Sequence, residues 1–389
     1  VLLALCGCVV NKLLSDTISM YDASAISRFP AVCHVILKLL MSLMVIGGYG
    51  LGILSLRLFY VFQVVITGGV VLFLIISLRR DNRARFPEYI SRGVREYLKE
   101  YYVYCRPLVV ATVISQLVVM LMNYALMSFS GVTEQAMFGA AWQLNLLVSY
   151  VFSPYAELMK REFAVVAGDR QMLCDHFRQS VRMMLLVTGY FSVFLAVCAG
   201  WVLPIVYGEK YIGAVLVTQI IMYYTIYQAV GQVTGAYFIA TERTRVQAVF
   251  TIVFQVLTLG AVFLFQIPNG IWPEGLGATG IALNYLTVNI INVVLMVGFI
   301  IREYGLSPIW ENLAGIPVIA ALTGAALIFR ELFSLIPGEG IVMIFIRVIL
   351  TGICYTAATG LIIWLFPGLT LGATREAIRA KLARIRKVD

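Results

Sequence analysis

Long apolar stretches recur along this chain and are separated by short polar segments. An α-helix needs about 20 apolar residues to cross a hydrocarbon core of roughly 30 Å. Lipid leaves only helices and closed barrels able to satisfy their own backbone hydrogen bonds, and these runs are too long for buried strands. The pattern therefore predicts an all-α integral membrane protein with eleven transmembrane helices, at 1–19, 31–48, 51–77, 107–129, 134–154, 183–206, 212–240, 246–266, 276–301, 313–330 and 341–366.

The longest polar interruption is the segment 79–106, RRDNRARFPEYISRGVREYLKEYYVYCR, which holds eight Lys or Arg and four Asp or Glu. The apolar segments before and after it look like two versions of one design, so we interpret it as a bridge between two membrane-embedded halves. This divides the chain into a partial N-terminal lobe of three helices at 1–78, a basic cytoplasmic bridge at 79–106, a C-terminal six-helix lobe at 107–302, two additional helices at 303–366, and a basic amphipathic cytoplasmic tail at 367–389.

A weak internal repeat supports the two halves. Residues 22–76 begin with a polar turn, run through one apolar span to a Gly-Leu-Gly turn at 50–52, and continue into a second span. Residues 241–302 repeat this order around a Gly-Leu-Gly turn at 275–277. An arginine holds the equivalent place in each copy, at Arg28 and Arg245. Repeats of hydropathy are typical of transporters that rock two lobes around a central site.

Composition agrees with a membrane protein and excludes a soluble one. Hydrophobic residues make up 61% of the 389 residues and charged residues only 13%, with a mean hydropathy of +0.91. Val1 already lies within an apolar run, without an initiator Met or a charged leader and cleavage site. We therefore expect an N-terminally incomplete chain rather than a signal peptide.

The distribution of Lys and Arg predicts the orientation. One set of connections holds 23 of them and the opposite set only two, Lys210 and Arg330. Lys and Arg accumulate on the cytoplasmic side, so the bridge and the C-terminus are predicted to be cytoplasmic and Val1 to lie on the far side. The 23 are Arg28, eight in the bridge, five between Lys160 and Arg182, Arg243, Arg245, Arg302, and six from Arg375 onward.

The tail has two interpretations. Its apolar residues Ile378, Leu382 and Ile385 share one helical face among basic residues. Such a helix can lie on anionic membrane lipids, and a solvated basic tail fits the same residues equally well.

The sequence lacks the motifs of an enzyme. It has no GxSxG, HExxH, phosphate-cradling glycine loop or acidic pair, and its two histidines are His34 and His176. The seven cysteines are scattered without metal-ligand spacing, so we expect no metal and no cofactor. A net charge of +9 in a membrane protein follows the orientation rule and does not call for nucleic acid.

Charged residues within the predicted spans are the first candidates for a substrate site, because each is costly at mid-bilayer unless it faces a cavity or a partner. Lys12, Lys38 and Arg57 are candidates for a cavity wall, although Lys12 can instead pair with Asp16 four residues later. Arg347 lies near the far-side end of its span, where it can snorkel to the interface. The excess of cations over acids favours an anionic cargo.

Side-chain amides are the second candidates, because they hydrogen-bond sugar hydroxyls as well as neighbouring helices. Gln116 and Asn123 lie seven residues apart on one helical face, which is our best candidate for a cavity wall, and Gln143 and Asn145 follow in the next span. Other amides in the spans after the bridge are Gln219, Gln228, Gln232, Asn284, Asn289 and Asn292.

Taken together, these patterns resemble a known family, the polysaccharide transporters. The resemblance rests on twin sets of spans joined by a basic bridge, the turn-Arg-span-GLG-span unit in each half, the segment VLPIVYGEKYIGAVLVTQII, and the segment SPYAELMKREFAVVAGDRQML. These features are similar to the Wzx-type O-antigen flippases of the multidrug/oligosaccharidyl-lipid/polysaccharide (MOP) exporter superfamily. Family members typically have fourteen helices, so this chain would correspond to helices four to fourteen.

The resemblance implies a flippase of the inner (plasma) membrane in polysaccharide, O-antigen or lipopolysaccharide biosynthesis. Such proteins move lipid-linked oligosaccharides, usually on undecaprenyl diphosphate, to the outer face by alternating access. Lys38 and Arg57 would then meet the diphosphate, and the amides the sugars. Coupling to protons or sodium stays open.

Two other functions stay open. A multidrug cation antiporter of the same superfamily is expected to use buried carboxylates, which are scarce here. A membrane-embedded glycan polymerase or ligase is expected to need reactive residues on a sizeable far-side loop, and these loops are short.

Overall fold

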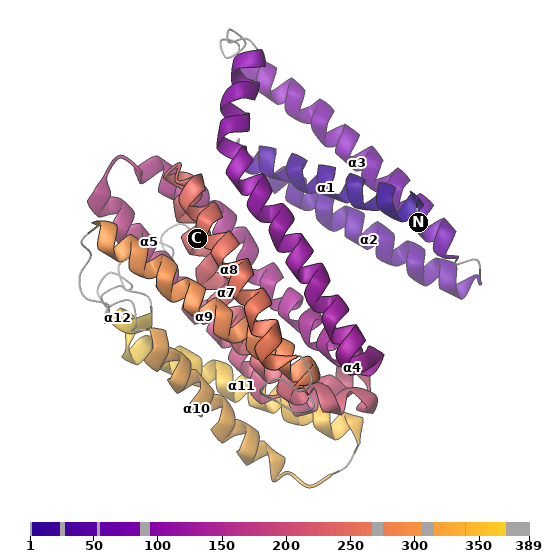
Figure 1. Ribbon diagram of the computed structural model, residues 1–389. Helices are drawn as coiled ribbons and strands as arrows, with labels where there is room; N and C mark the ends of the chain where they lie inside the picture. Colours follow the sequence, from indigo (N-terminus) through magenta and orange to yellow (C-terminus); the bar gives the residue numbers. More distant parts are fainter. Residues whose placement is uncertain are drawn as a thin grey trace, which may run out of the picture. The chain divides into compact units, whose positions relative to one another are not determined.

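The computed structural model describes residues 2–23, 28–52, 55–85, 94–266, 275–304, 315–338 and 340–370, and the predicted tail lies outside them apart from its first four residues. All regular structure in these ranges is helical, as predicted (Figure 1). Contacts divide the chain into two compact units, Val1–Tyr101 and Tyr102–Asp389, and the boundary falls within the predicted bridge. The helices are α1 (Leu2–Ala23), α2 (Arg28–Gly50), α3 (Leu56–Arg85), α4 (Val94–Val166), α5 (Arg170–Val197), α6 (Ala199–Tyr207), the 3₁₀ helix η2 (Glu209–Ala214), α7 (Val215–Ala240), α8 (Thr244–Phe265), α9 (Gly277–Tyr304), α10 (Gly315–Ser334), α11 (Ile341–Leu365) and α12 (Pro367–Thr370).

The first unit is a small helical bundle in which α1 packs chiefly against α3 and α2 also contacts α3. The Tyr21 hydroxyl donates a 2.9 Å hydrogen bond to the Leu74 carbonyl and joins α1 to α3. Its ring is fully buried, so it fills the core and satisfies its polar atom at once. The core residues of this unit are Leu14, Tyr21, Leu37, Val71, Leu74 and Leu78.

Helix α4 contains a reversal of the chain at Gly131, where the backbone leaves the helical region with φ 89° and ψ 177°. The Gln135 amide donates a 3.5 Å hydrogen bond to the Asn123 amide oxygen. Twelve residues of straight helix would separate these two residues by about 18 Å, so the chain folds back on itself. The two predicted spans at 107–129 and 134–154 therefore exist as two helices on either side of a glycine turn.

The span predicted at 183–206 has different bounds in the structure. The helix begins 13 residues earlier, at Arg170, because the Asp169 carboxylate caps it by accepting hydrogen bonds from the Gln171 and Met172 amides, each 3.0 Å long. It then breaks at Cys198 into α6. The polar residues of these first turns hid the extension from a hydropathy criterion.

The core of the second unit lies around α7, which packs against both α5 and α9. Helices α10 and α11 lie side by side, and α10 also packs on α5 (Figure 1). Nine helical stretches in the described residues are long and apolar enough to cross a membrane, among them 98–166, which contains the reversal at Gly131. Many large apolar side chains on these helices are exposed, as expected of surfaces that face lipid. The chain is therefore a multi-pass membrane protein.

The structure supports the repeat at the level of its turns. Each Gly-Leu-Gly turn joins two adjacent helices, α2 and α3 in the first unit and α8 and α9 in the second. The second glycine of each turn has a positive φ, 67° at Gly52 and 52° at Gly277, a conformation that favours glycine. Equivalent glycines therefore perform the same backbone task in both copies.

Contacts in the second unit also bear out the predicted alternation of sides. The Glu134 carboxylate accepts a 2.8 Å hydrogen bond from the Ala278 amide, which brings two predicted far-side turns together. At the other end, Arg243 forms an ion pair with Glu303, whose carbonyl accepts a 2.9 Å hydrogen bond from Arg170. Connections assigned to one side by their Lys and Arg are thus in contact with one another.

A candidate substrate cavity lined by amides

The second unit contains a cavity of about 420 Å³ between α4, α7, α8 and α9. Small-molecule pockets in proteins typically enclose about 300–1,000 Å³, so this space holds a group of moderate size. It reaches the end of the unit where α7 is followed by α8, because Ile239 lies in the last turn of α7 and Gln247 in the first turn of α8. The connection between these two helices holds Arg243. Its polar lining residues are Ser153, Glu157, Lys160, Gln228, Gln232, Gln247, Thr251, Asn289 and Asn292.

Small residues on α7 open the space. Gly231, Gly235 and Ala236 present little or no side chain to the cavity, so the polar groups of the neighbouring helices meet there. A Cβ added at Gly235 would lie 3.3 Å from the Gln247 amide nitrogen, closer than an ordinary contact. Glycine at this position therefore lets α8 bring its amide close to the α7 backbone.

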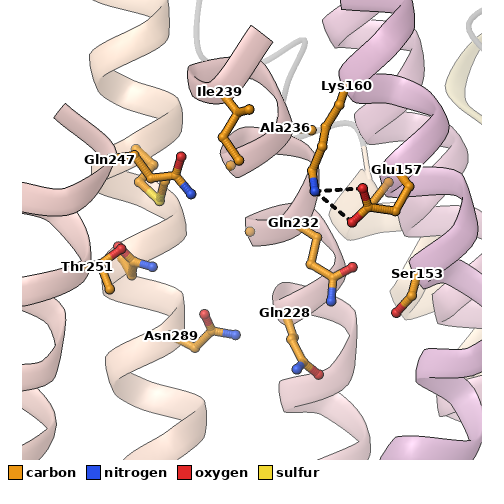
Figure 2. Close-up of a pocket in the computed structure, with 15 residues that line it drawn as sticks. Ser153, Glu157, Lys160, Gln228, Gln232, Ala236, Ile239, Gln247, Thr251 and Asn289 are labelled. Carbon is orange, nitrogen blue, oxygen red and sulfur yellow. Dashed lines mark hydrogen bonds and ion pairs between the residues drawn. The ribbon is translucent and has the colours of Figure 1, made fainter. Parts of the chain in front are cut away.

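Figure 2 shows the arrangement of the polar groups. Asn289 on α9 points toward α7, which carries Gln228 and Gln232, and Gln247 approaches from α8. Ser153 and Glu157 lie on the opposite wall, on α4. The cavity is thus lined mainly by neutral groups that both donate and accept hydrogen bonds.

The charged groups of the cavity wall form a pair. The Lys160 ammonium donates to both Glu157 carboxylate oxygens, at 2.6 and 2.8 Å. The two residues lie three apart on α4, so they share one face of the helix. Among the described lining residues these are the only charged ones, and their charges cancel, so the wall carries no net charge.

Three of the lining amides each have one side-chain atom without a hydrogen-bond partner. The side-chain oxygens of Gln228 and Gln247 and the side-chain nitrogen of Asn289 are buried and unpartnered. Asn289 as a whole is only 6% exposed. A buried polar group left unpaired costs about 1–3 kcal/mol, so these atoms are suited to receiving a ligand or water.

A cluster of aromatic rings lies one helical turn from the cavity. Trp142 stacks against Tyr224 with ring centroids 5.9 Å apart, and the centroids of Trp142 and Tyr285 are 5.2 Å apart. Tyr224 precedes Gln228 by four residues on α7, and Tyr285 precedes Asn289 by four on α9. Residues at this spacing share a helix face and are offset by about 6 Å, so the rings and the amides follow the same faces.

The three cationic candidates from the sequence lie in the first unit. Lys12 forms a 2.8 Å ion pair with Asp16, which confirms the local pairing left open above. Lys38 on α2 and Arg57 at the start of α3 have exposed side chains and take part in none of the ion pairs between described residues. Their role in substrate binding stays a prediction.

The four amide candidates belong to α4 and do not line the cavity. Gln116 and Gln143 are exposed, and the Asn123 amide donates a 3.0 Å hydrogen bond to the Val119 carbonyl of its own helix. Asn145 is completely buried and accepts a 2.8 Å hydrogen bond from the Thr225 hydroxyl on α7. In the structure the Asn123 amide group therefore bonds within its own helix, whereas Asn145 joins α4 to α7. The part of all four amides in binding stays a prediction.

The polar residues that line the cavity share a pattern in the sequence. They occur as pairs three or four apart within apolar helices, so each pair presents two polar groups on one face. Asn123 and Gln143 lack such a partner, whereas Gln116 has Thr112 and Asn145 has Ser149, so the pattern alone does not separate lining amides from the others. The pairs that line the cavity are Glu157 and Lys160, Gln228 and Gln232, Gln247 and Thr251, and Asn289 and Asn292.

Comparison with solved structures identifies the fold. A MOP superfamily transporter from Pyrococcus furiosus, described as having a binding pocket of reversed polarity, matches with a TM-score of 0.61 and 12% identity over 78% of this chain and 68% of its own. The lipid II flippase MurJ, in an inward closed conformation, matches with a TM-score of 0.60 and 13% identity over 91% of this chain and 71% of its own. The chain has the MOP-superfamily fold.

A third solved structure with a similar fold is that of MATE. The structure of MATE in complex with MaL6 gives a TM-score of 0.61 and 14% identity over 78% of this chain and 70% of that one. The sequence matches no protein-family model and no curated protein. At 12 to 14% identity the MOP-superfamily likeness establishes the fold alone, and the branch must be argued from the residues.

Proposed function

We propose that this chain is a transporter that flips lipid-linked oligosaccharide, of the undecaprenyl-diphosphate type, across the inner membrane by alternating access. The single observation that carries this proposal is the neutral, amide-lined cavity within a MOP-superfamily fold. Amides suit the hydroxyl groups of a glycan, and the fold is shared with a protein described as a lipid II flippase. The product would serve polysaccharide or O-antigen synthesis.

Lys38 and Arg57 are our candidates for contact with the diphosphate. Both are cationic residues on apolar helices, where an unpartnered charge facing lipid would cost a few kcal/mol. An aqueous path with an anionic substrate removes this cost, because phosphate oxygens pair well with ammonium and guanidinium groups. Lys38 and Arg57 are therefore our candidates for the anionic part of the substrate.

A cation antiporter is the second candidate, and one residue favours it. Glu157 is a carboxylate on the cavity wall, which is the kind of group that binds a proton, sodium or a cationic drug. Its two oxygens already accept hydrogen bonds from Lys160. Because that pairing neutralises the carboxylate, the flippase fits the cavity better.

Glycan display in a host that lacks its own flippase tests the proposal. The full-length gene is expected to restore surface polysaccharide when compared with the empty vector. Continued absence of surface glycan in several such hosts, with lipid-linked oligosaccharide accumulating inside, would contradict it. Resistance to cationic drugs in the same cells would instead support the antiporter.

The double variant K38M/R57M tests the role of the two cations. If they meet the diphosphate, the variant is expected to lose glycan display while its protein level, followed by immunoblot, stays normal. K210M, which removes an exposed lysine at the predicted far-side turn, is the matched control. Full display by K38M/R57M would remove both residues from the mechanism.

A further inference from the structure

The amide cavity has the composition of a subsite for a specific class of ligand, and three properties of its wall define that class. The unpartnered buried atoms include two acceptors, on Gln228 and Gln247, and one donor, on Asn289. A hydroxyl group both donates and accepts, so hydroxyls can satisfy all three atoms. A metal or ammonium ion satisfies only acceptors and a phosphate only donors. Each amide has both a donor and an acceptor, and a hydroxyl can pair with whichever of the two faces the cavity.

The charges on the wall point to a neutral ligand. Glu157 and Lys160 neutralise each other through two hydrogen bonds, and the described lining adds no third charge. A cation or an anion would therefore meet no uncompensated opposite charge on this wall. A neutral ligand leaves the pair intact.

The size and surroundings fit one or two ring-sized groups. The cavity encloses about 420 Å³, and its lining comes from four helices, so a ligand would meet polar groups from several directions. The aromatic rings of Trp142, Tyr224 and Tyr285 lie one turn along the same helix faces. These rings pack against one another outside the cavity, so the apolar C–H faces of a sugar would instead meet the lining residues Ala156, Ile239 and Met296.

We infer that this cavity binds a neutral sugar unit through its hydroxyl groups, independently of any phosphate or lipid attached to it. The inference rests on the proposed function in one respect, since it takes the sugar to be part of the transported glycan. Gln228, Gln247 and Asn289 are the primary hydrogen-bonding residues, and the pair of Glu157 and Lys160 lines the wall beside them.

The first test measures binding of a glycan that lacks both phosphate and lipid. Mild acid releases free oligosaccharide from the lipid-linked oligosaccharide of a host whose glycan display the full chain restores. Saturation-transfer NMR then measures its binding to the purified full chain in nanodiscs. The double variant Q228L/N289L is expected to lower the affinity about tenfold or more, because at least two hydrogen bonds are lost. The control Q179L removes an exposed amide of α5, outside the cavity, and is expected to bind like the wild type.

Thermal unfolding of the same samples separates a binding role from a structural one. Replacing buried, unpartnered amides with leucine removes a desolvation cost, so Q228L/N289L is expected to unfold at the same temperature or higher. A lower unfolding temperature together with unchanged glycan binding would show that the amides serve packing, and it would overturn the inference. Wild-type binding by Q228L/N289L overturns it in the same way.

The outcomes distinguish this inference from the proposed function. If the chain restores glycan display and Q228L/N289L does so equally well, the flippase stands and the subsite is wrong. If no host is complemented, the purified chain is tested with glucose, galactose, rhamnose and N-acetylglucosamine. Binding of any of these that depends on Gln228 and Asn289 supports the subsite without the flippase. Absence of binding by all four overturns it.

Discussion

At the scale of single residues, Glu157 and Lys160 set the charge of the cavity wall, so removing one member is expected to change which ligands bind. K160M leaves an uncompensated carboxylate and is expected to favour a cation, for which tetraphenylphosphonium is a suitable probe. E157Q leaves an uncompensated ammonium and is expected to favour glucuronate over glucose. The pair is partly exposed, since the Lys160 side chain is 33% accessible and the Glu157 side chain 50%. Each shift in affinity is therefore about fivefold at most.

The double variant E157Q/K160M is the matched control for this prediction. It removes both charges and keeps the wall neutral, so its preference is expected to return to uncharged sugar. Titration calorimetry with the purified protein measures all three variants. Equal affinities of K160M and the wild type for tetraphenylphosphonium would show that the pair does not set the charge preference.

Arg347 offers a second prediction at this scale. Its guanidinium donates hydrogen bonds of 2.7 and 3.0 Å to the carbonyls of Ile336 and Gly338, and so fastens the turn between α10 and α11. Snorkelling alone would require only a long cationic side chain, which lysine also provides. Because lysine lacks the planar fork, R347K is expected to lose about 1 kcal/mol of stability and R347M about 2. Thermal unfolding in detergent measures both, and an unchanged R347K would favour snorkelling.

At the scale of elements, the two Gly-Leu-Gly turns make a graded prediction. At Gly277 a Cβ would lie 2.6 Å from a Glu134 carboxylate oxygen, and φ is positive as well. At Gly52 the φ is positive but no atom lies within 4 Å. G277A is therefore expected to cost about 2 kcal/mol or more, from strain and clash together, and G52A about 1 kcal/mol from strain alone.

A glycine inside a helix serves as the control for the turns. Gly139 lies in the second half of α4 with no atom within 4 Å of an added Cβ, so G139A is expected to be neutral or slightly stabilising. Thermal unfolding of the three variants should give the order G277A, G52A, G139A from least to most stable. A G139A variant as unstable as G277A would contradict this explanation.

The elements also show how far sequence patterns reach. Hydropathy located the helices because lipid-facing and core residues alike are apolar, and the Gly131 turn interrupts that pattern visibly. It missed the first 13 residues of α5, whose polar turns lie outside the predicted span and start at the Asp169 cap. The cavity was missed for another reason. Whether an amide such as Asn145 or Asn289 joins helices or lines a space depends on its neighbours across the bundle, and those come from other spans.

At the scale of the whole molecule, the Lys and Arg residues predict which connections share a side of the membrane. Contacts within the second unit show which of its connections lie together. Contacts such as Arg170 with Glu303 bring connections of one predicted side together, and Glu134 with Ala278 does so for the other. The alternation of sides in the second unit thus follows from contacts alone. Which side is cytoplasmic is a property of the membrane and follows only from the charge bias.

Labelling of single cysteines tests the predicted orientation. Glu209 and Gly168 are both exposed and lie at opposite predicted sides of the second unit. In a chain whose seven native cysteines are replaced by serine or alanine, E209C is expected to react with a membrane-impermeant maleimide in intact spheroplasts. G168C is expected to react only after permeabilisation, because 23 of the 29 Lys and Arg residues favour the cytoplasm for the connections of its side. The reverse labelling pattern would show that the predicted orientation is wrong. The amide cavity would then lie toward the outer face, where it would release a glycan rather than receive one from the cytoplasm.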